Sequence, residues 1–420
     1  MNRLRYGAAV AVLGVLLGAV PADAAAGDLD STFGGDGIAV TAEPPIVDDR
    51  LDVVVQDDGK VVVVGEAYGA YLVARFTTDG SLDPTFSEDG WLKVTFRNAD
   101  YARATAVGLD STGRLLVGGK TGRGIGVTRI WPGGRVDRTY GDQGRALVPS
   151  SAGSYLNDLV VDPSDRVVFG GWRFTGSFEP NGGEMVVGRL TPDGDLDPTF
   201  RGGGLVAIDP PRDSAIEAIG LLADGRIVGA GSHAPHAGGS RTGLVRLWPD
   251  GRRDRSFGDD GIVSLDLAPG DEAATGLAVQ AGGRVTVTGW SGGGARILLA
   301  RLGPAGRRDP MFGGGDGVVV TDLGRGTEQG VDVVAVGAGR VAVVADMRGG
   351  FDQRAVVLRY GIDGALDPTF GGDGWTPVNP TTDPDAAQAI ALAPSGDLVI
   401  AIGVPGPVGD QVGVARLLTS

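Results

Sequence analysis

Residues 29–37 read Leu-Asp-Ser-Thr-Phe-Gly-Gly-Asp-Gly, and variants of this stretch return six more times along the 420-residue chain. Each copy keeps an aspartate and an aromatic residue three positions later, and six of the seven keep Ser or Thr directly before the aromatic. The anchor aspartates, 53 to 60 residues apart, are Asp30, Asp83, Asp137, Asp197, Asp254, Asp309 and Asp367. A period of this length indicates a repeat architecture in which each copy is one supersecondary unit.

An arginine forms a second regularity, because it recurs eight residues before each anchor aspartate that follows it. These arginines are Arg75, Arg129, Arg189, Arg246, Arg301, Arg359 and Arg416. Arg416 has no aspartate after it, and Asp30 has no arginine before it. If the repeats close into a ring, these two residues should occupy the place of one further pair. Sevenfold repetition suits a scaffold better than a single site, so we assign both sets of residues to the architecture.

Each repeat contains four strand-like runs, which in the first copy are 38–42, 51–56, 60–65 and 70–76. Gly59 supplies the positive φ of a tight hairpin between the second and third runs, and Asp165 takes this place in the third copy. The third run is apolar on both faces, as in the four valines of 61–64. Radially stacked sheets bury both faces, so the sequence predicts an all-β fold, a seven-bladed β-propeller with four antiparallel strands per blade. A β-solenoid is the alternative, although its coils are usually shorter.

The repeats account for nearly the whole chain after a short leader. They span about 29–81, 82–135, 136–195, 196–252, 253–307, 308–365 and 366–420, which predicts one propeller domain over 27–420. Residues 1–26 have a basic start at Arg3 and Arg5, an apolar run over 8–20 and small residues at 22–26, the pattern of a cleaved signal peptide. The apolar run is too short to span a bilayer, and there is no cysteine for a disulfide. We therefore expect a secreted monomer without membrane insertion.

The formal net charge of −15 bears on the partners. Phosphate backbones and anionic lipid surfaces attract basic proteins, so nucleic acid and anionic membranes are not expected partners. The expected partner is therefore a protein or a glycan.

The quoted elements together resemble the delta-60 repeat family of secreted bacterial proteins. The resemblance rests on Leu-Asp-Pro-Thr-Phe-Gly-Gly-Asp-Gly at 366–374, Asp-Gly-Lys at 58–60 and Ala-Arg-Phe-Thr-Thr-Asp-Gly-Ser at 74–81. It covers all seven copies and is looser at 252–254 and 307–309, where arginines precede the aspartate. The family implies an exported, propeller-like protein and no defined activity, so it carries over no functional residue.

Candidate catalytic and metal-binding groups are few. Asp193, Asp195 and Asp197 alternate like the start of a calcium loop, but Pro198 stands where such a loop needs glycine. These three aspartates are weak candidates for a metal site, which would bind calcium, and no other cofactor is expected. The two histidines, His233 and His236, are expected to be exposed in a loop. The Gly-x-Ser-x-Gly match at 289–293 lacks the strand–turn–helix setting of a nucleophile elbow.

Aromatic residues on a long insertion of the third copy are the best binding candidates. Trp172, Phe174 and Phe178 lie there, and Trp290 lies in the corresponding region of another copy. Exposed aromatic rings stack on sugars or fill a partner's pocket. We therefore predict a non-catalytic scaffold that binds a protein, a glycan or a cell-surface component. The alternatives are a secreted glycan hydrolase or lyase with carboxylates at the propeller channel, none of which the sequence can single out, and a propeller stabilised by calcium.

Overall fold

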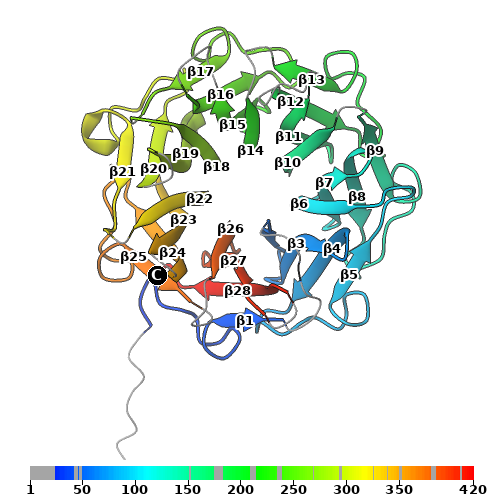
Figure 1. The fold of residues 1–420 in the computed structure, drawn as a ribbon, viewed down its shortest axis with the longest axis horizontal. Coiled ribbons are helices and arrows are strands. Elements are labelled where there is room, and N and C mark those ends of the chain that lie inside the picture. The colour runs from blue at the N-terminus through cyan, green and yellow to red at the C-terminus, as the bar shows by residue number, and fades with distance from the viewer. Residues whose placement is uncertain are drawn as a thin grey trace, which may run out of the picture.

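Seven four-stranded antiparallel sheets stand around a central axis like the blades of a propeller (Figure 1). This confirms the predicted fold class. The computed structural model describes residues 24–420 apart from 42–45, 47–49, 151–152, 175–182, 209–213, 234–238, 268, 293–295, 325, 338, 350–351, 380–384 and 407–408. The predicted signal peptide thus lies almost wholly outside the described residues. Within the described part of the chain, no helix is long and apolar enough to cross a bilayer.

Six blades consist of strands that are consecutive in the chain, with the innermost strand first. Blades 1 to 3 are β2 (Asp52–Val55), β3 (Val61–Ala67), β4 (Ala70–Phe76) and β5 (Trp91–Val94); β6 (Ala102–Leu109), β7 (Leu115–Thr121), β8 (Gly124–Ile130) and β9 (Arg145–Pro149); β10 (Ser154–Val161), β11 (Val167–Phe174), β12 (Gly183–Leu190) and β13 (Leu205–Ile208). Blades 4 to 6 are β14 (Ala215–Leu221), β15 (Ile227–His233), β16 (Arg241–Leu247) and β17 (Ile262–Leu265); β18 (Glu272–Gln280), β19 (Arg284–Ser291), β20 (Arg296–Leu302) and β21 (Val318–Thr321); β22 (Thr327–Val336), β23 (Arg340–Gly349), β24 (Asp352–Tyr360) and β25 (Trp375–Val378).

Blade 7 joins the two ends of the described chain. Its inner strands are β26 (Ala386–Leu392), β27 (Leu398–Val404) and β28 (Gln411–Leu417), and its outermost strand is β1 (Ile38–Val40). Ile38 pairs with Ala415 and Val40 with Gly413, and Figure 1 shows β1 beside β28. The first strand of every sequence repeat is therefore the outermost strand of the preceding blade, which closes the ring by backbone hydrogen bonds.

The core lies between the blades, where the faces of neighbouring sheets meet. All residues of β3 are buried, as predicted for a run that is apolar on both faces, and all residues of β4 are buried as well, including the charged Arg75. The motif aromatics enter the same interfaces and are 1% exposed or less; they are Phe33, Phe86, Tyr140, Phe200, Phe257, Phe312 and Phe370. Burial of one such ring contributes about 2–3 kcal/mol, so seven copies supply a large part of the inter-blade adhesion.

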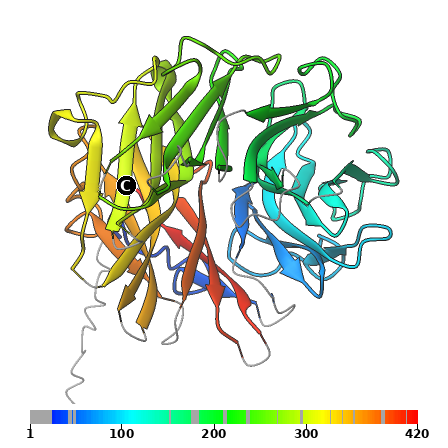
Figure 2. The same ribbon diagram turned by 45° about the horizontal axis from the view of Figure 1, so that its top comes forward.

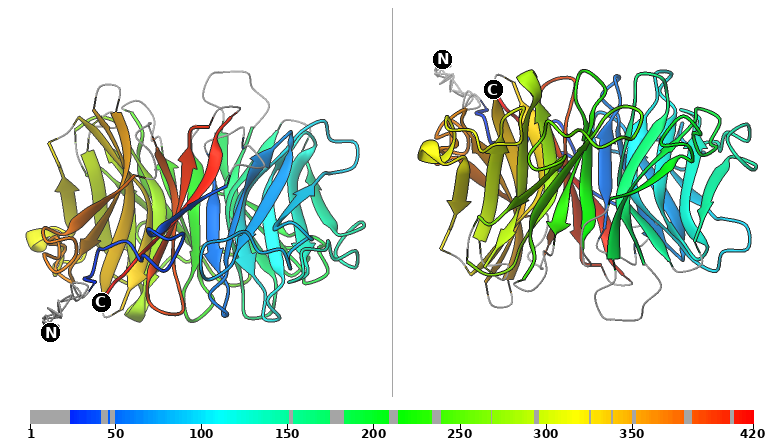
Figure 3. Two further views of the ribbon diagram at one scale, coloured as in Figure 1. Left: turned by 90° about the horizontal axis from the view of Figure 1, so that it is seen from below. Right: turned by 90° about the horizontal axis from the view of Figure 1, so that it is seen from above.

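The ring has two different faces (Figures 2 and 3). The repeat face carries the anchor turns, such as 83–90, and the hairpins between the two innermost strands of each blade, such as 56–60. The loop face carries the hairpins between the second and third strands, such as 67–70, and the connections from one blade to the next, such as 95–101. Sequence repetition is therefore concentrated on the repeat face.

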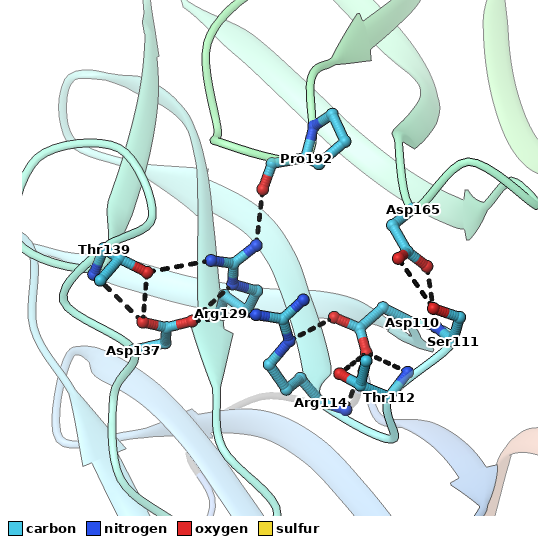
Figure 4. A network of polar contacts seen from close by, with 9 residues as sticks. All are labelled: Asp110, Ser111, Thr112, Arg114, Arg129, Asp137, Thr139, Asp165 and Pro192. Carbon is cyan, nitrogen blue, oxygen red and sulfur yellow. Dashed lines mark hydrogen bonds and ion pairs between the residues drawn. The ribbon is translucent and has the colours of Figure 1, made fainter.

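A network around the recurrent arginine explains this repetition (Figure 4). The Nε of Arg129 donates to Asp137 Oδ2 at 2.8 Å, and its Nη2 donates to Thr139 Oγ1 at 3.2 Å. Its Nη1 donates to the carbonyl of Pro192, which belongs to the next blade. The guanidinium also lies over the Tyr140 ring, 4.8 Å from the centroid. One arginine thus ties its own strand, the anchor turn and the neighbouring blade together.

The same ion pair is present in all seven blades. The Nε–Oδ2 distances are 2.7–2.9 Å, and Arg416 and Asp30 meet at 2.7 Å as the sequence predicts. A second cation from the inner hairpin lies 3.0–3.8 Å from Oδ2 in blades 1 to 6; these cations are Lys60, Arg114, Arg166, Arg226, Arg284 and Arg340. Blade 7 carries Asp397 at this place in the sequence.

Two further details concern an anchor aspartate, Asp83, and the hairpin residue Asp165. Burial alone would raise the pKa of Asp83, but hydrogen bonds from Thr85 and Lys60 and the charge of Arg75 lower it to about 2. Asp165 adopts φ 58° at the place where most other copies have glycine, as expected for the third hairpin. Its carboxylate also accepts hydrogen bonds from the amide and hydroxyl of Ser111 in blade 2, both at 2.8 Å (Figure 4).

Candidate functional site

A polar ring lines the central channel close to the loop face. The innermost strands of blades 2 to 7 each contain a β-bulge near their loop-face ends, and a bulge presents an extra side chain. The bulged residues are Thr105, Asn157, Glu217, Thr275, Val331 and Gln388. All six line one cavity together with Arg50 and Leu51 of blade 1.

Three aspartates follow this ring at one equivalent position of blades 1, 3 and 6. They are Asp52, Asp158 and Asp332, and the other four blades have Ala or Gly there. Each carboxylate accepts one hydrogen bond from the next amide of its own strand and one from the neighbouring blade. For Asp52 the donors are the amides of Val53 at 2.8 Å and Val107 at 2.7 Å. These carboxylates therefore clamp the innermost strands of adjacent blades.

The clamp carboxylates have altered acidity because they are partly buried at the channel wall. Burial raises the pKa of Asp52 to about 7, and the charge of Asp332 adds to this rise. Burial also raises the pKa of Asp332 to about 6, and raises that of Asp158 well above its usual range. Backbone hydrogen bonds oppose each of these shifts. A carboxyl group with such a pKa can exchange a proton near neutral pH, as general acids and bases do.

Glu217 is the fourth carboxylate of the channel. Its Oε2 accepts from Asn157 Nδ2 at 3.1 Å and lies 3.7 Å from Arg50 Nη1. Burial raises its pKa, and Arg50 counteracts the shift. Among the channel carboxylates, Glu217 is the one held by side chains rather than by the main chain of two blades. None of the four is a member of the sevenfold motif, so repetition in the sequence gave no signal for them.

An aromatic cluster lies on the loop face where blades 2 and 3 meet. Tyr155 and Trp172 are stacked with centroids 4.2 Å apart, and Phe174 meets the Trp172 ring edge-on at 4.7 Å. Lys120 of blade 2 places its Nζ 4.1 Å from the Tyr155 centroid and donates to the phenolic oxygen at 2.7 Å. Phe174 is 40% exposed. We call Tyr155, Trp172, Phe174 and Lys120 the aromatic cluster.

The structure corrects the predicted environment of these aromatic residues. Trp172 and Phe174 belong to strand β11 and pair with Met185 and Gly183, so they are not in an irregular loop. An antiparallel partner strand fixes their directions and makes the cluster rigid. Phe178 lies outside the described residues. Tyr155 was missed because it looks like an ordinary strand residue, although alternation along 154–161 could have placed it opposite Trp172.

Trp290 occupies the same register as Trp172, but two blades away. It pairs with Ala273 where Trp172 pairs with Tyr155. The structure therefore does not bring Trp290 together with Trp172 and Phe174, and the four predicted binding residues do not form one site.

The candidate metal ligands lie on the repeat face. Asp197 Oδ1 accepts from the amide and hydroxyl of Thr199, and Oδ2 accepts from Arg189 at 2.8 Å. Its two oxygens are thus engaged in the repeat network, while Asp193 and Asp195 lie in the preceding turn. Within the described ranges there is no group of three or more His, Asp or Glu side chains with the geometry of a metal site. Calcium binding stays a prediction.

Two other sequence candidates also have structural roles. His233 ends β15 and is 6% exposed, so the prediction of an exposed loop histidine is wrong for this residue. Its Nδ1 lies 3.1 Å from Ser264 Oγ, and burial lowers the pKa of the imidazole. His236 lies outside the described residues. Ser291 ends β19, is buried, and is followed by another strand rather than a helix.

Comparison with known proteins agrees with the fold and leaves the activity open. A family model described as a domain of unknown function (DUF5122), beta-propeller, matches residues 56–86 and 222–257. No curated protein matches the chain significantly.

Solved structures with similar folds have low sequence identity. A putative oxidoreductase (glucose dehydrogenase) from Thermus thermophilus is 18% identical, with 74% of this chain and 95% of that chain covered and a TM-score of 0.42. YCF48 bound to D1 peptide is 12% identical, with coverages of 91% and 96% and a TM-score of 0.48. The polysaccharide lyase Uly1 is 11% identical, with coverages of 75% and 78% and a TM-score of 0.45. The two segments 56–86 and 222–257 are thus similar to the propeller repeats that this family model describes.

Proposed function

We propose that the chain is a secreted, non-catalytic scaffold that acts as a monomer and binds a glycan, a protein or another cell-surface component through its loop face. The aromatic cluster carries this proposal. Three rings from two paired strands form a rigid surface, with Phe174 exposed and Tyr155 and Trp172 half-buried, at a place that departs from the sevenfold repeat. Among these ligands a glycan fits best, because aromatic planes stack on sugar rings and Lys120 supplies a donor beside them.

The main-chain hydrogen bonds of the channel aspartates support the absence of catalysis. Asp52, Asp158 and Asp332 each use their carboxylate to clamp two blades, which is a sufficient reason for their presence. Moving such a group during a reaction would break two backbone contacts. The clamps therefore favour a structural role for the channel.

A glycan hydrolase or lyase is the second candidate. The raised pKa of the channel carboxylates favours it, because a catalytic acid works best with a pKa near the operating pH. Glu217 is the residue to test, since its replacement by Gln keeps an acceptor for Asn157 and removes the acid.

Co-sedimentation with cell walls and insoluble polysaccharides tests both candidates in one tube. The mature chain is incubated with each polymer, and the pelleted protein and the soluble fragments are both measured. Retention without fragments is the expected result. Fragments that increase with time in the parent protein and disappear in Glu217→Gln would overturn the scaffold and establish the channel as an active site.

A further inference from the structure

A second hollow lies on the repeat face where blades 3 and 4 meet. Its lining residues are Arg201, Trp248, Arg252, Arg253, Arg255 and Asp260, which we call the arginine pocket. Arg201 comes from the anchor turn of blade 3, and the others come from the segment between β16 and β17 of blade 4. The amide of Arg201 donates to the carbonyl of Asp250 at 2.9 Å, so the two turns are joined directly.

We infer that the arginine pocket binds an acidic polysaccharide, with a sugar ring against Trp248 and a carboxylate or sulfate group on the arginines. Four guanidinium groups in one hollow are unexpected in a chain with a net charge of −15. Planar guanidinium groups recognise such oxyanions with two parallel hydrogen bonds. This inference does not depend on the aromatic cluster, which lies on the opposite face.

The pocket arises where the sequence departs from its own repeat. The position of Arg201 is occupied in the other copies by small residues: Gly34, Ser87, Gly141, Gly258, Gly313 and Gly371. Arg201 adopts φ 51°, a conformation that costs a residue with a side chain about 1 kcal/mol. Arg255 stands where Pro84, Pro198, Pro310 and Pro368 preorganise the turn in four copies. Among the described residues of its turn Arg201 forms no ion pair, and Arg255 pairs in its own turn only with Asp260, at 3.0 Å, so both keep guanidinium donors for a role outside the turn.

The charges in the pocket are incompletely neutralised. Arg252 pairs with Asp250 at 2.7 Å, and Asp260 lies 3.3 Å from Arg253 and 3.0 Å from Arg255, so two carboxylates face four guanidinium groups. Arg201 has no ion pair among the residues that the structure describes. The pocket therefore keeps guanidinium donors for an anion from outside. Arg255 is 83% exposed at its side chain, so a polymer can reach it without rearrangement of the fold.

Trp248 supplies an apolar plane beside these donors. It is 42% exposed, and the Cζ of Arg226 lies 5.4 Å from its ring centroid. Arg226 is itself fixed by Asp254 at 3.0 Å, which belongs to the repeat network. The ring is thus supported from within the blade while part of it stays accessible. An aromatic plane flanked by arginines matches a sugar that carries an acidic group.

Binding to three soluble polymers tests the inference: polygalacturonate, dextran sulfate and uncharged dextran. Affinity is measured with the mature chain by titration calorimetry at low and at raised salt. We expect either acidic polymer to bind, dextran not to bind, and salt to weaken binding, because screening acts on exposed charges. Failure of both acidic polymers to bind, or equal binding of dextran, would overturn the inference.

A double variant, Arg201→Gly with Arg255→Pro, gives the two positions the residues that most of the other copies have. It should fold at least as stably as the parent and bind the acidic polymer about tenfold more weakly, because two of four guanidinium groups are lost. Trp248→Thr should also weaken binding. Trp131→Thr removes an equally exposed ring from blade 2, where Ser87 of the neighbouring anchor turn takes the place of Arg201, and should leave binding unchanged. Arg123→Ala with Arg296→Ala removes the same charge from the loop face. An equal loss in either control would contradict a specific pocket.

Discussion

Replacing Arg129 by Met tests how much the sevenfold network stabilises the ring. Arg129 is 5% exposed, and its Met replacement keeps the length of the side chain but loses the contacts to Asp137, Thr139 and Pro192. Loss of one partner of a buried ion pair costs about 3–5 kcal/mol. Arg114 stays 3.4 Å from Asp137 and compensates part of this cost. We therefore expect a loss near the lower limit, about 3 kcal/mol at pH 7.

The pH dependence identifies the cause of this loss. Burial would raise the pKa of Asp137, but the hydrogen bonds from Thr139 and the charge of Arg129 lower it below its usual value. A lowered carboxyl pKa contributes stability that is present at neutral pH and disappears as the pH falls through the folded-state pKa. The unpaired carboxylate of the variant is protonated more easily. The difference between parent and variant should therefore shrink on acidification.

Urea unfolding at a series of pH values measures this difference as a shift of the transition midpoint at constant slope. Arg296→Met is the matched control, because Arg296 forms a surface ion pair with Asp322 at 3.3 Å and its side chain is 56% exposed. Such a pair contributes at most about 1 kcal/mol. A loss below about 1 kcal/mol for Arg129→Met, or a loss that does not change with pH, would refute the reasoning.

Three further predictions concern the closure and the channel. Because the pKa values of Asp52, about 7, and Asp332, about 6, are raised, the folded protein retains protons that the unfolded chain releases. The free energy of unfolding should therefore decrease as the pH rises from about 4 to about 7, by up to about 1.4 kcal/mol per pH unit and group. Over this range the urea midpoint of Asp52→Asn should fall less steeply than that of the parent. Asp397→Arg supplies blade 7 with the second cation that its sequence lacks beside Asp30, and should raise the free energy of unfolding by about 0.5 kcal/mol. An unchanged urea midpoint would contradict this role of the inner hairpin cation. Deletion of residues 24–41 removes β1 and exposes the edge of β28, so size-exclusion chromatography should show association of the truncated chain rather than a stable monomer.

The fold was largely predictable because it follows from a pattern repeated seven times. The spacing of Asp30 and its equivalents indicated the number of blades. The unmatched Arg416 and Asp30 indicated a closed ring, and in the structure Arg416 Nε lies 2.7 Å from Asp30 Oδ2. The offset between repeat and blade was not predicted, because strand pairing decides to which sheet the run at 38–42 belongs. Repetition in the sequence therefore predicts the scaffold features that all copies share.

The candidate sites were less predictable because they lie where the copies differ. Asp158 and Asp332 follow a β-bulge, and Asp52 reaches the equivalent place through the register of β2, which the sequence does not display. Tyr155 joins Trp172 through cross-strand pairing, and Trp290 is kept away by the blade between them. The arginine pocket had a signal, the loosened motif at 252–254, but its meaning depended on Arg201 from the neighbouring blade. Contacts between blades thus required the three-dimensional structure.

Removal of the aromatic cluster tests the central claim most directly. The double variant Trp172→Ala with Phe174→Ala is compared with Trp290→Ala, which removes a ring at the same register outside the cluster. Both are sedimented with the polymer that retains the parent protein, after urea unfolding has shown that each is folded. We predict that the double variant stays in the supernatant and that Trp290→Ala is pelleted like the parent. Full retention of the folded double variant would contradict binding through the loop-face cluster.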